Sequence, residues 1–204
     1  MCQIITEQCT FVINGAWNTA IIQPDWLRSQ FPTLIPSELE ILFIPGNVRL
    51  LRYDLGNITL EPNNNRLIFI PKKIDDETLD YIAKLSTEIQ RKLPHTPISA
   101  AGANYFFELD ENEYFCIPGL ENIEELKDHY KDFVQAELTS KVLRHTFSFS
   151  DHQLNIDFRI NHDTKIVQYN YHYKLSEPIE MASKSLKNNL NYSEKLNKKL
   201  IQSN

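Results

Sequence analysis

The stretch that decides the fold is Leu154–Tyr173, LNIDFRINHDTKIVQYNYHY, in which apolar and polar residues alternate on either side of a short polar segment. Strict alternation is typical of a strand that buries one face and exposes the other. If residues 161–164 form a turn, the two segments pair as an antiparallel hairpin. The predicted core pairs are Leu154 with Tyr171, Ile156 with Tyr169 and Phe158 with Val167.

The opposite face of this hairpin is polar, and it supplies the candidate binding residues. They are Asn155, Asp157, Arg159, Gln168, Asn170 and His172. Asparagine and aspartate are poor strand formers, so their placement in mid-strand favours a binding surface slightly over plain strand stability. The alternative is that this face is only solvated, as antiparallel sheets often are on one side. We expect these positions to be exposed, so that reversing the charges of Asp157 and Arg159 would weaken binding and barely change stability.

The strand before the hairpin, 142–149, extends both faces. Leu143, Phe147 and Phe149 share the apolar parity, and Arg144, Thr146 and Ser148 share the polar one. A broad sheet face of mixed polarity follows from this pattern.

Helices are expected at four places. Residues 75–93 carry apolar residues at spacings of three and four, acidic residues at the start and basic residues at the end. A second helix is predicted from Asn122, a third from about Ser176 and a short one over 25–31. Further strands are expected at 9–14, 39–44, 48–53, 58–61, 66–70 and 104–109, separated by proline, glycine and asparagine clusters.

The order of these elements divides the chain into two halves of similar pattern. Residues 1–97 form a first α+β half, residues 98–190 a second half of similar element order, and residues 191–204 a weakly ordered or helical basic tail. The predicted fold class is α+β, an antiparallel sheet with helices on one side. A doubled unit of this kind resembles the TATA-binding-protein-like saddle in element order, without any shared sequence motif. The alternative is one sheet that wraps one long helix.

Composition predicts a soluble protein of the cytoplasm. The 204 residues are 42% hydrophobic, without an apolar run long enough to span a bilayer, and the N-terminus does not resemble a secretory signal. Three cysteines without C-x-x-C spacing favour reduced thiols over disulfides or zinc. The net charge of −6 disfavours nucleic acid as a partner, although it does not exclude it. We expect a protein partner and no membrane association.

Catalytic and cofactor signals are weak. The chain carries no phosphate-binding, dinucleotide-binding, nucleophile-elbow or zinc-protease motif, and only five glycines. Among the histidines, His152 and His172 are the only pair that could meet, at one end of the sheet, and two ligands do not close a metal site. We therefore predict no cofactor, no metal and no catalytic residue.

Three hypotheses of function follow. The first is a non-enzymatic interaction module, a small subunit or adaptor of a cytoplasmic complex that presents a polar sheet face or edge to a protein. The second is a saddle-type nucleic-acid-binding protein, which the acidic balance disfavours. The third is an enzyme or small-ligand binder whose site has no recognised motif.

Overall fold

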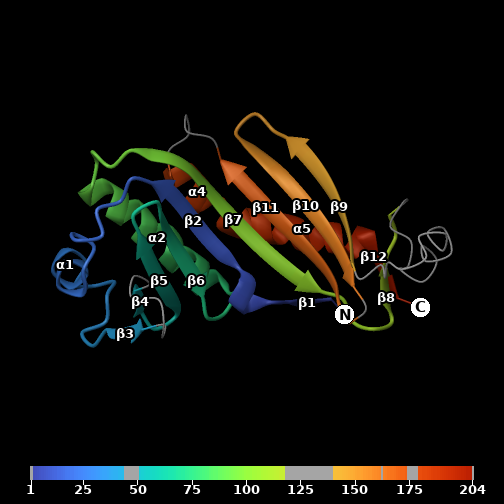
Figure 1. Cartoon of the computed structure of the whole chain (residues 1–204), viewed down its shortest axis with the longest axis horizontal. Coiled ribbons are helices and arrows are strands. Elements are labelled where there is room, and N and C mark those ends of the chain that lie inside the picture. Colours follow the sequence, from blue (N-terminus) through green and yellow to red (C-terminus); the bar gives the residue numbers. More distant parts are fainter. Residues whose placement is uncertain (1, 44–50, 118–139, 162, 174–178, 204) are drawn as a thin grey trace, which may run out of the picture.

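The computed structural model describes residues 2–43, 51–117, 140–161, 163–173 and 179–203. These residues form an α+β fold in which helices cover one face of a large antiparallel sheet (Figure 1). The helical elements are η1 (Thr6–Gln8), α1 (Pro24–Gln30), α2 (Asp76–Lys92), α4 (Ile179–Lys184) and α5 (Leu186–Leu200). The strands are β1 (Gln3–Ile4), β2 (Thr10–Gly15), β3 (Glu40–Phe43), β4 (Leu51–Asp54), β5 (Ile58–Asn63), β6 (Arg66–Pro71), β7 (Ile98–Glu108), β8 (Glu113–Phe115), β9 (Ser140–Ser148), β10 (His152–Asn161), β11 (Lys165–Tyr173) and β12 (Ile201–Ser203).

Ten of the described strands belong to one sheet, in the order β3-β4-β5-β6-β2-β7-β11-β10-β9, with β1 paired to the end of β7. In this order β2 and β7, the first long strands of the two sequence halves, lie side by side at the centre. The last strand of each half, β6 or β11, flanks its own first strand. The division into two halves of similar element order and the likeness to the saddle architecture stay predictions.

The hairpin predicted from Leu154–Tyr173 is confirmed with its register. Leu154 pairs with Tyr171, and Phe158 pairs with Val167. The Asn161 side chain fixes the turn, because its Oδ1 accepts hydrogen bonds from the backbone N–H groups of Asp163 (2.9 Å) and Thr164 (2.6 Å). This is the local bonding for which asparagine is favoured in turns.

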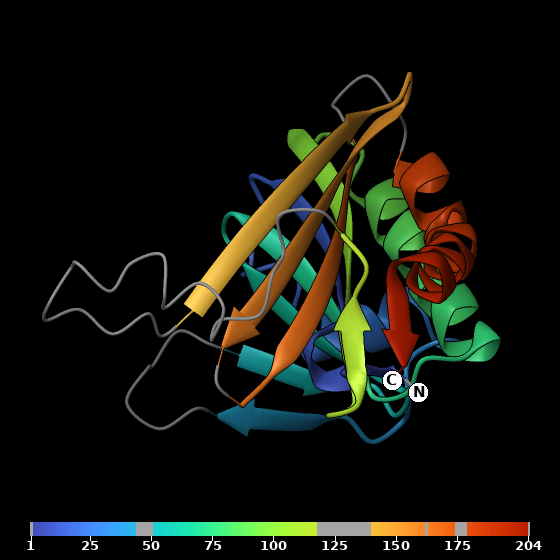
Figure 2. The same ribbon diagram turned by 90° about the vertical axis from the view of Figure 1, so that its right-hand side faces the viewer.

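The helices α2, α4 and α5 lie on one side of the sheet (Figure 2). The tyrosines of β11 and β7 join that face to α5, because each buries an aromatic ring and still gives its hydroxyl a partner. Tyr169 donates to Asn197 Oδ1 (2.6 Å), and Tyr105 donates to the carbonyl of Leu186 (2.7 Å). Aromatic and aliphatic side chains from both halves of the chain form one continuous core.

Helix α2 begins where the sequence predicts. Asp75 is its N-cap, and the carboxylate accepts from the backbone N–H of Thr78 at 2.8 Å. Its buried positions include Leu79, Ile82, Leu85 and Ile89, the residues of the predicted apolar stripe. The helix predicted from Asn122 lies outside the described residues. In place of the single helix predicted from Ser176, the structure has two helices, α4 and the longer α5, which extends from residue 186 to residue 200.

Several of the described strands differ from the prediction, including the two-residue strand β1. Strand β7 begins at Ile98 rather than at Asn104, because the small residues Ala101 and Ala103 pack into the core while remaining fully extended. The short strands β8 and β12 were not predicted either. They are far apart in the sequence and pair with each other in a separate two-stranded sheet. Neither segment is long enough to show an alternating pattern.

Candidate functional site

A row of hydrogen-bonded side chains crosses the face of the sheet opposite α2, α4 and α5. We call it the amide row. Its members, one from each of the adjacent strands β9, β10, β11, β7 and β2, are Thr146, Asn155, Asn170, Asn104 and Thr10. They lie at one level because each is the direct cross-strand partner of the next.

Every bond in the amide row runs in the same direction. Thr146 Oγ1 donates to Asn155 Oδ1 (2.9 Å), and Asn155 Nδ2 donates to Asn170 Oδ1 (3.3 Å). Asn170 Nδ2 donates to Asn104 Oδ1 (2.5 Å), and Asn104 Nδ2 donates to Thr10 Oγ1 (3.0 Å). Bonds that run head to tail polarise one another, and each fixes the rotamer of the side chain beside it. The row is therefore a rigid polar feature on an otherwise open surface.

Asn104 is the centre of this network. Besides its bonds to Asn170 and Thr10, its Oδ1 accepts from Gln168 Nε2 at 3.4 Å. Gln168 Oε1 in turn accepts from Arg159 at 2.6 Å. The network thus joins the amide row to the charged residues beside it.

An ionic cluster lies next to the amide row. Arg144 donates through Nε and NH2 to the two carboxylate oxygens of Asp157, at 2.6 and 2.7 Å. Arg159 NH2 is 3.5 Å from Asp157 Oδ2. The hydrogen bonds from Arg144 lower the pKa of Asp157 below its ordinary value, and the charge of Arg159 acts in the same direction. Asp157 is therefore ionised at neutral pH.

The expectation that all six candidate residues are exposed is wrong for Asp157. Asp157 is only 4% exposed, since the two arginines and the neighbouring strands enclose it. Arg159 is exposed, and Asn155, Gln168, Asn170 and His172 are half-buried. Replacing Asp157 by lysine would set a buried ammonium against Arg144, so the expected charge reversal would also destabilise the fold.

His152 and His172, the one histidine pair that the sequence allowed to meet, lie on opposite faces of the sheet. His172 pairs with Gln153 and lies on the open face, whereas His152 pairs with Tyr173 and lies on the core face. There His152 stacks on Phe149, with ring centroids 4.5 Å apart, and its Nδ1–H donates a hydrogen bond to Asp151 Oδ1 (2.8 Å). A shift of one position along a strand reverses the face, which is why the two rings are separated.

Toward β6 the open face becomes more apolar. Val12 lies between Gly102 and Ile68 in the register, and Ile68 is almost completely buried. A Cβ on Gly102 would stand 3.0 Å from the carbonyl oxygen of Tyr171, tighter than ordinary contact. Beyond Ile68, Glu61 is buried and ion-paired to Arg52 at 2.8 Å.

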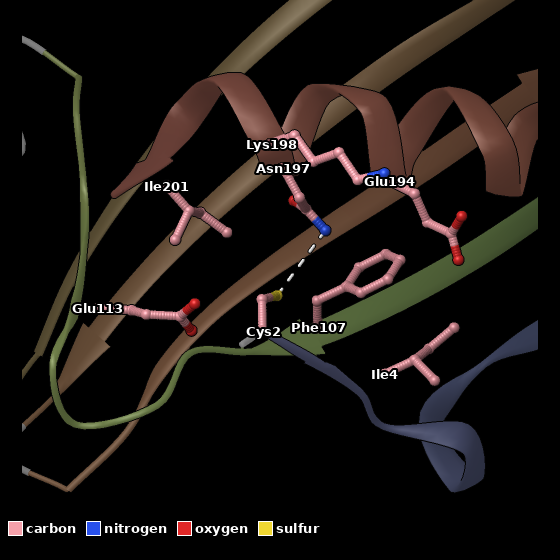
Figure 3. A pocket seen from close by; sticks show the side chains of 8 residues that line it. All are labelled: Cys2, Ile4, Phe107, Glu113, Glu194, Asn197, Lys198 and Ile201. Atoms are coloured by element: carbon pink, nitrogen blue, oxygen red, sulfur yellow. Dashed lines mark hydrogen bonds between the residues drawn. The ribbon is translucent and has the colours of Figure 1, made fainter. Parts of the chain in front are cut away.

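A cavity of about 400 Å³ lies on the other side of the sheet, near the N-terminus (Figure 3). It is lined by Cys2, Ile4, Phe107, Glu113, Glu194, Asn197, Lys198 and Ile201. The Cys2 thiol and the Asn197 amide point toward each other across it, with Nδ2 and Sγ 3.8 Å apart. Burial raises the pKa of Cys2 to about 12, so the thiol is protonated at neutral pH and is a poor nucleophile. Asn197 already accepts a hydrogen bond from Tyr169, so this amide stabilises the fold.

Neither a cluster of metal-ligating side chains nor a membrane-spanning helix is found in the part of the chain that the structure describes. No three histidine, cysteine, aspartate or glutamate side chains in it are grouped as a metal site would require. None of its helices has the length and apolar character needed to cross a membrane.

Together, the fold and this surface define an α+β protein with helices on one face of an antiparallel sheet and an ordered polar network on the other. No protein-family model and no curated protein matches the chain.

Proposed function

We propose that this protein is a non-enzymatic interaction module, a small subunit or adaptor of a cytoplasmic complex, that binds a protein partner through the open face of its sheet. The observation that carries the proposal is the amide row, which crosses five strands on a face that no described helix covers. The proposed binding residues are Asn155, Asp157, Arg159, Gln168, Asn170 and His172, together with the other members of the amide row, Asn104, Thr10 and Thr146.

The fixed amides suit a polar protein interface. Each primary amide has two N–H donors and two acceptor lone pairs. Each asparagine of the row donates one N–H within it and keeps the second N–H for a partner, whereas Oδ1 of Asn104 and of Asn155 already accepts two hydrogen bonds. Because the rotamers are already held by hydrogen bonds, little side-chain entropy is lost on binding. Peptide groups and amide side chains of a protein partner have the matching chemistry.

The charges of the open face favour a protein over a nucleic acid. The charged residues with open-face parity on the described strands are Arg52, Arg66, Arg144 and Arg159, against Glu40, Asp54, Glu61, Glu108 and Asp157. Arg144 and Arg52 are moreover paired with carboxylates. Phosphate binding requires an excess of unpaired basic groups, which this face does not offer.

The test is affinity capture from the native source with matched variants. Asn104→Ala removes the centre of the amide row, and Lys84→Ala changes an exposed residue of α2 on the helix side. A partner that uses the face is recovered with wild type and Lys84→Ala and is depleted with Asn104→Ala. Equal recovery with all three proteins would contradict the proposal, and retention on DNA that weakens with salt would favour a nucleic-acid partner instead.

A further inference from the structure

The three asparagines of the amide row have a surplus of free donors. Each donates one N–H of its Nδ2 group within the row, and no group in the described part of the chain accepts from the other N–H. Oδ1 of Asn104 and Oδ1 of Asn155 each accept two hydrogen bonds already, whereas Oδ1 of Asn170 accepts one. Three N–H donors and one amide lone pair are therefore left for a partner.

This surplus selects an occupant that offers acceptors without donors. An ordinary peptide chain has one N–H for each C=O, and an N–H that faces an amide N–H is left without a partner, which is costly once it is buried. Proline keeps the carbonyl and has no N–H. A run of prolines thus presents only acceptors. A second copy of this chain would set the same N–H surplus against itself, which disfavours self-association through this face.

The spacing of the donors also fits a proline backbone. Asn155, Asn170 and Asn104 are direct cross-strand partners on β10, β11 and β7, with β11 in the middle (Figure 1). Neighbouring strands are about 4.8 Å apart, so the outer two asparagines are about 9.6 Å apart. A polyproline II helix has three residues per turn and rises about 3.1 Å per residue, so carbonyls recur on one side about every 9.3 Å. In a β-strand the same side recurs about every 6.7 Å, which does not keep this register.

Apolar side chains beside the row can receive the proline rings. Phe106 follows Asn104 on the same face of β7, and Val12 follows Thr10 on the same face of β2. Both Phe106 and Val12 are half-buried, so part of each side chain is open to a partner. Aromatic side chains are a usual component of surfaces that bind polyproline II segments.

The charges next to the row are already paired, which favours an uncharged occupant. Asp157 accepts two hydrogen bonds from Arg144 and lies 3.5 Å from Arg159. A charged segment would compete with these pairs, whereas a proline segment leaves them intact.

We infer that the open face binds a proline-rich segment of a protein partner in the polyproline II conformation, which lies along the amide row across β10, β11 and β7. The free amide N–H groups donate to its carbonyls, and Phe106 and Val12 contact its rings. Because proline restricts the backbone of the free segment, little conformational entropy is lost on binding. The inference rests on the proposed function, since it gives the chemistry of the protein partner that binds the open face.

The side-chain amide resonances of the asparagines, measured by NMR, test this inference. The ligand is a capped peptide of about nine prolines, about 28 Å long. The control is a glycine–serine peptide of equal length, which keeps its backbone N–H groups and is flexible. The proline peptide should shift the NH2 resonances of Asn104, Asn155 and Asn170 and should bind at least about tenfold more tightly than the control. No binding of the proline peptide, equal binding of the two peptides, or shifts confined to the helix side would overturn the inference.

Asn104→Asp tests the role of the free donor. A carboxylate has the shape of the amide but no N–H, and the Thr10 hydroxyl can reverse its bond and donate to it. The affinity for the proline peptide should fall at least about tenfold, and Lys84→Ala should bind as wild type does. If Asn104→Asp does not fold, Phe106→Ala serves instead, since loss of the ring should also weaken binding. Unchanged affinity in a folded variant would overturn the inference.

Competition with the captured partner separates this inference from the proposed function. Displacement of a partner that depends on Asn104 by the proline peptide supports both. If such a partner is found and the proline peptide neither binds nor displaces it, the open face is the interface and the inference is wrong. If the proline peptide binds but no captured partner depends on Asn104, the proposed function alone is contradicted. An oligonucleotide that shifts the asparagine resonances when the proline peptide does not would overturn the inference in favour of nucleic acid.

Discussion

Asp157 of β10 is held by Arg144 of β9 through two parallel hydrogen bonds, and Asp157 is buried while Arg144 is largely exposed. The pair links two strands at a non-hydrogen-bonded position, where opposite side chains are closest. How much this pair stabilises the folded protein therefore depends on whether the buried Asp157 carboxylate is ionised.

Asp157→Asn should destabilise the protein by about 1–2 kcal/mol at pH 7, because it removes a charge-assisted hydrogen bond at a buried position. The pKa of Asp157 is lower in the folded protein than in the unfolded chain, so its stabilising effect is complete above the unfolded pKa of about 4 and is lost as pH falls through the folded pKa. Urea unfolding of both proteins from pH 7 to pH 2 should show the difference shrinking in acid. A difference that is constant over this range would contradict the assignment.

Phe158→Ala should destabilise by about 3–5 kcal/mol, because the side chain is fully buried and its ring contacts Phe115 with centroids 5.2 Å apart. Val142→Ala, on the neighbouring strand, should change stability by less than about 0.5 kcal/mol because Val142 is exposed. Thermal or denaturant unfolding measures both. Equal effects would mean that the faces of the hairpin are assigned wrongly.

The hairpin and α2 could be predicted because local pattern determined them. The alternation of apolar and polar residues placed Phe158 and Tyr171 in the core. The start of α2 was indicated by Asp75 and the acidic residues that follow it. The burial of Asp157 could not be predicted, because it depends on Arg144 from another strand meeting it in register. The amide row was missed in part for the same reason: Asn155 and Asn170 were recognised, whereas Asn104 and Thr10 joined them only through the central pairing of β7 with β2.

The cysteines should differ in reactivity. Burial raises the pKa of Cys2 to about 12 and of Cys9 to about 11, whereas Cys116 is exposed. Iodoacetamide at pH 7.5 should therefore modify Cys116 first, because only the accessible thiolate reacts quickly. Peptide mapping by mass spectrometry measures the order. If Cys2 were modified as fast as Cys116, the raised pKa of the Cys2 thiol would be contradicted. The cavity would then be a candidate reactive site.

Gly15 should not tolerate a side chain. It lies at the register shift between β2 and β7, where an added Cβ would be 2.7 Å from the carbonyl oxygen of Pro97. Gly15→Ala should destabilise by about 1–3 kcal/mol, because backbone must move to relieve the contact. Gly56→Asn is a suitable comparison, since no atom lies within 4 Å of the added Cβ and any loss of stability there comes from the positive φ alone, which asparagine tolerates better than other residues with a side chain. Denaturant unfolding measures the effect. Equal unfolding midpoints for Gly15→Ala and wild type would contradict the close contact between residue 15 and the Pro97 carbonyl.

The affinity of the captured partner for Asn104→Ala distinguishes a binding surface on the open face from a face that is only solvated. Asn104 joins Asn170, Gln168 and Thr10 in one network on the open face, so its replacement should weaken binding at least about tenfold, or 1.4 kcal/mol. Titration calorimetry with wild type, Asn104→Ala and Lys84→Ala gives the affinities, and thermal unfolding of each confirms that the fold is intact. A tenfold or larger loss of affinity is expected for Asn104→Ala and not for Lys84→Ala. An Asn104→Ala protein that is folded and binds the partner as tightly as wild type would contradict it.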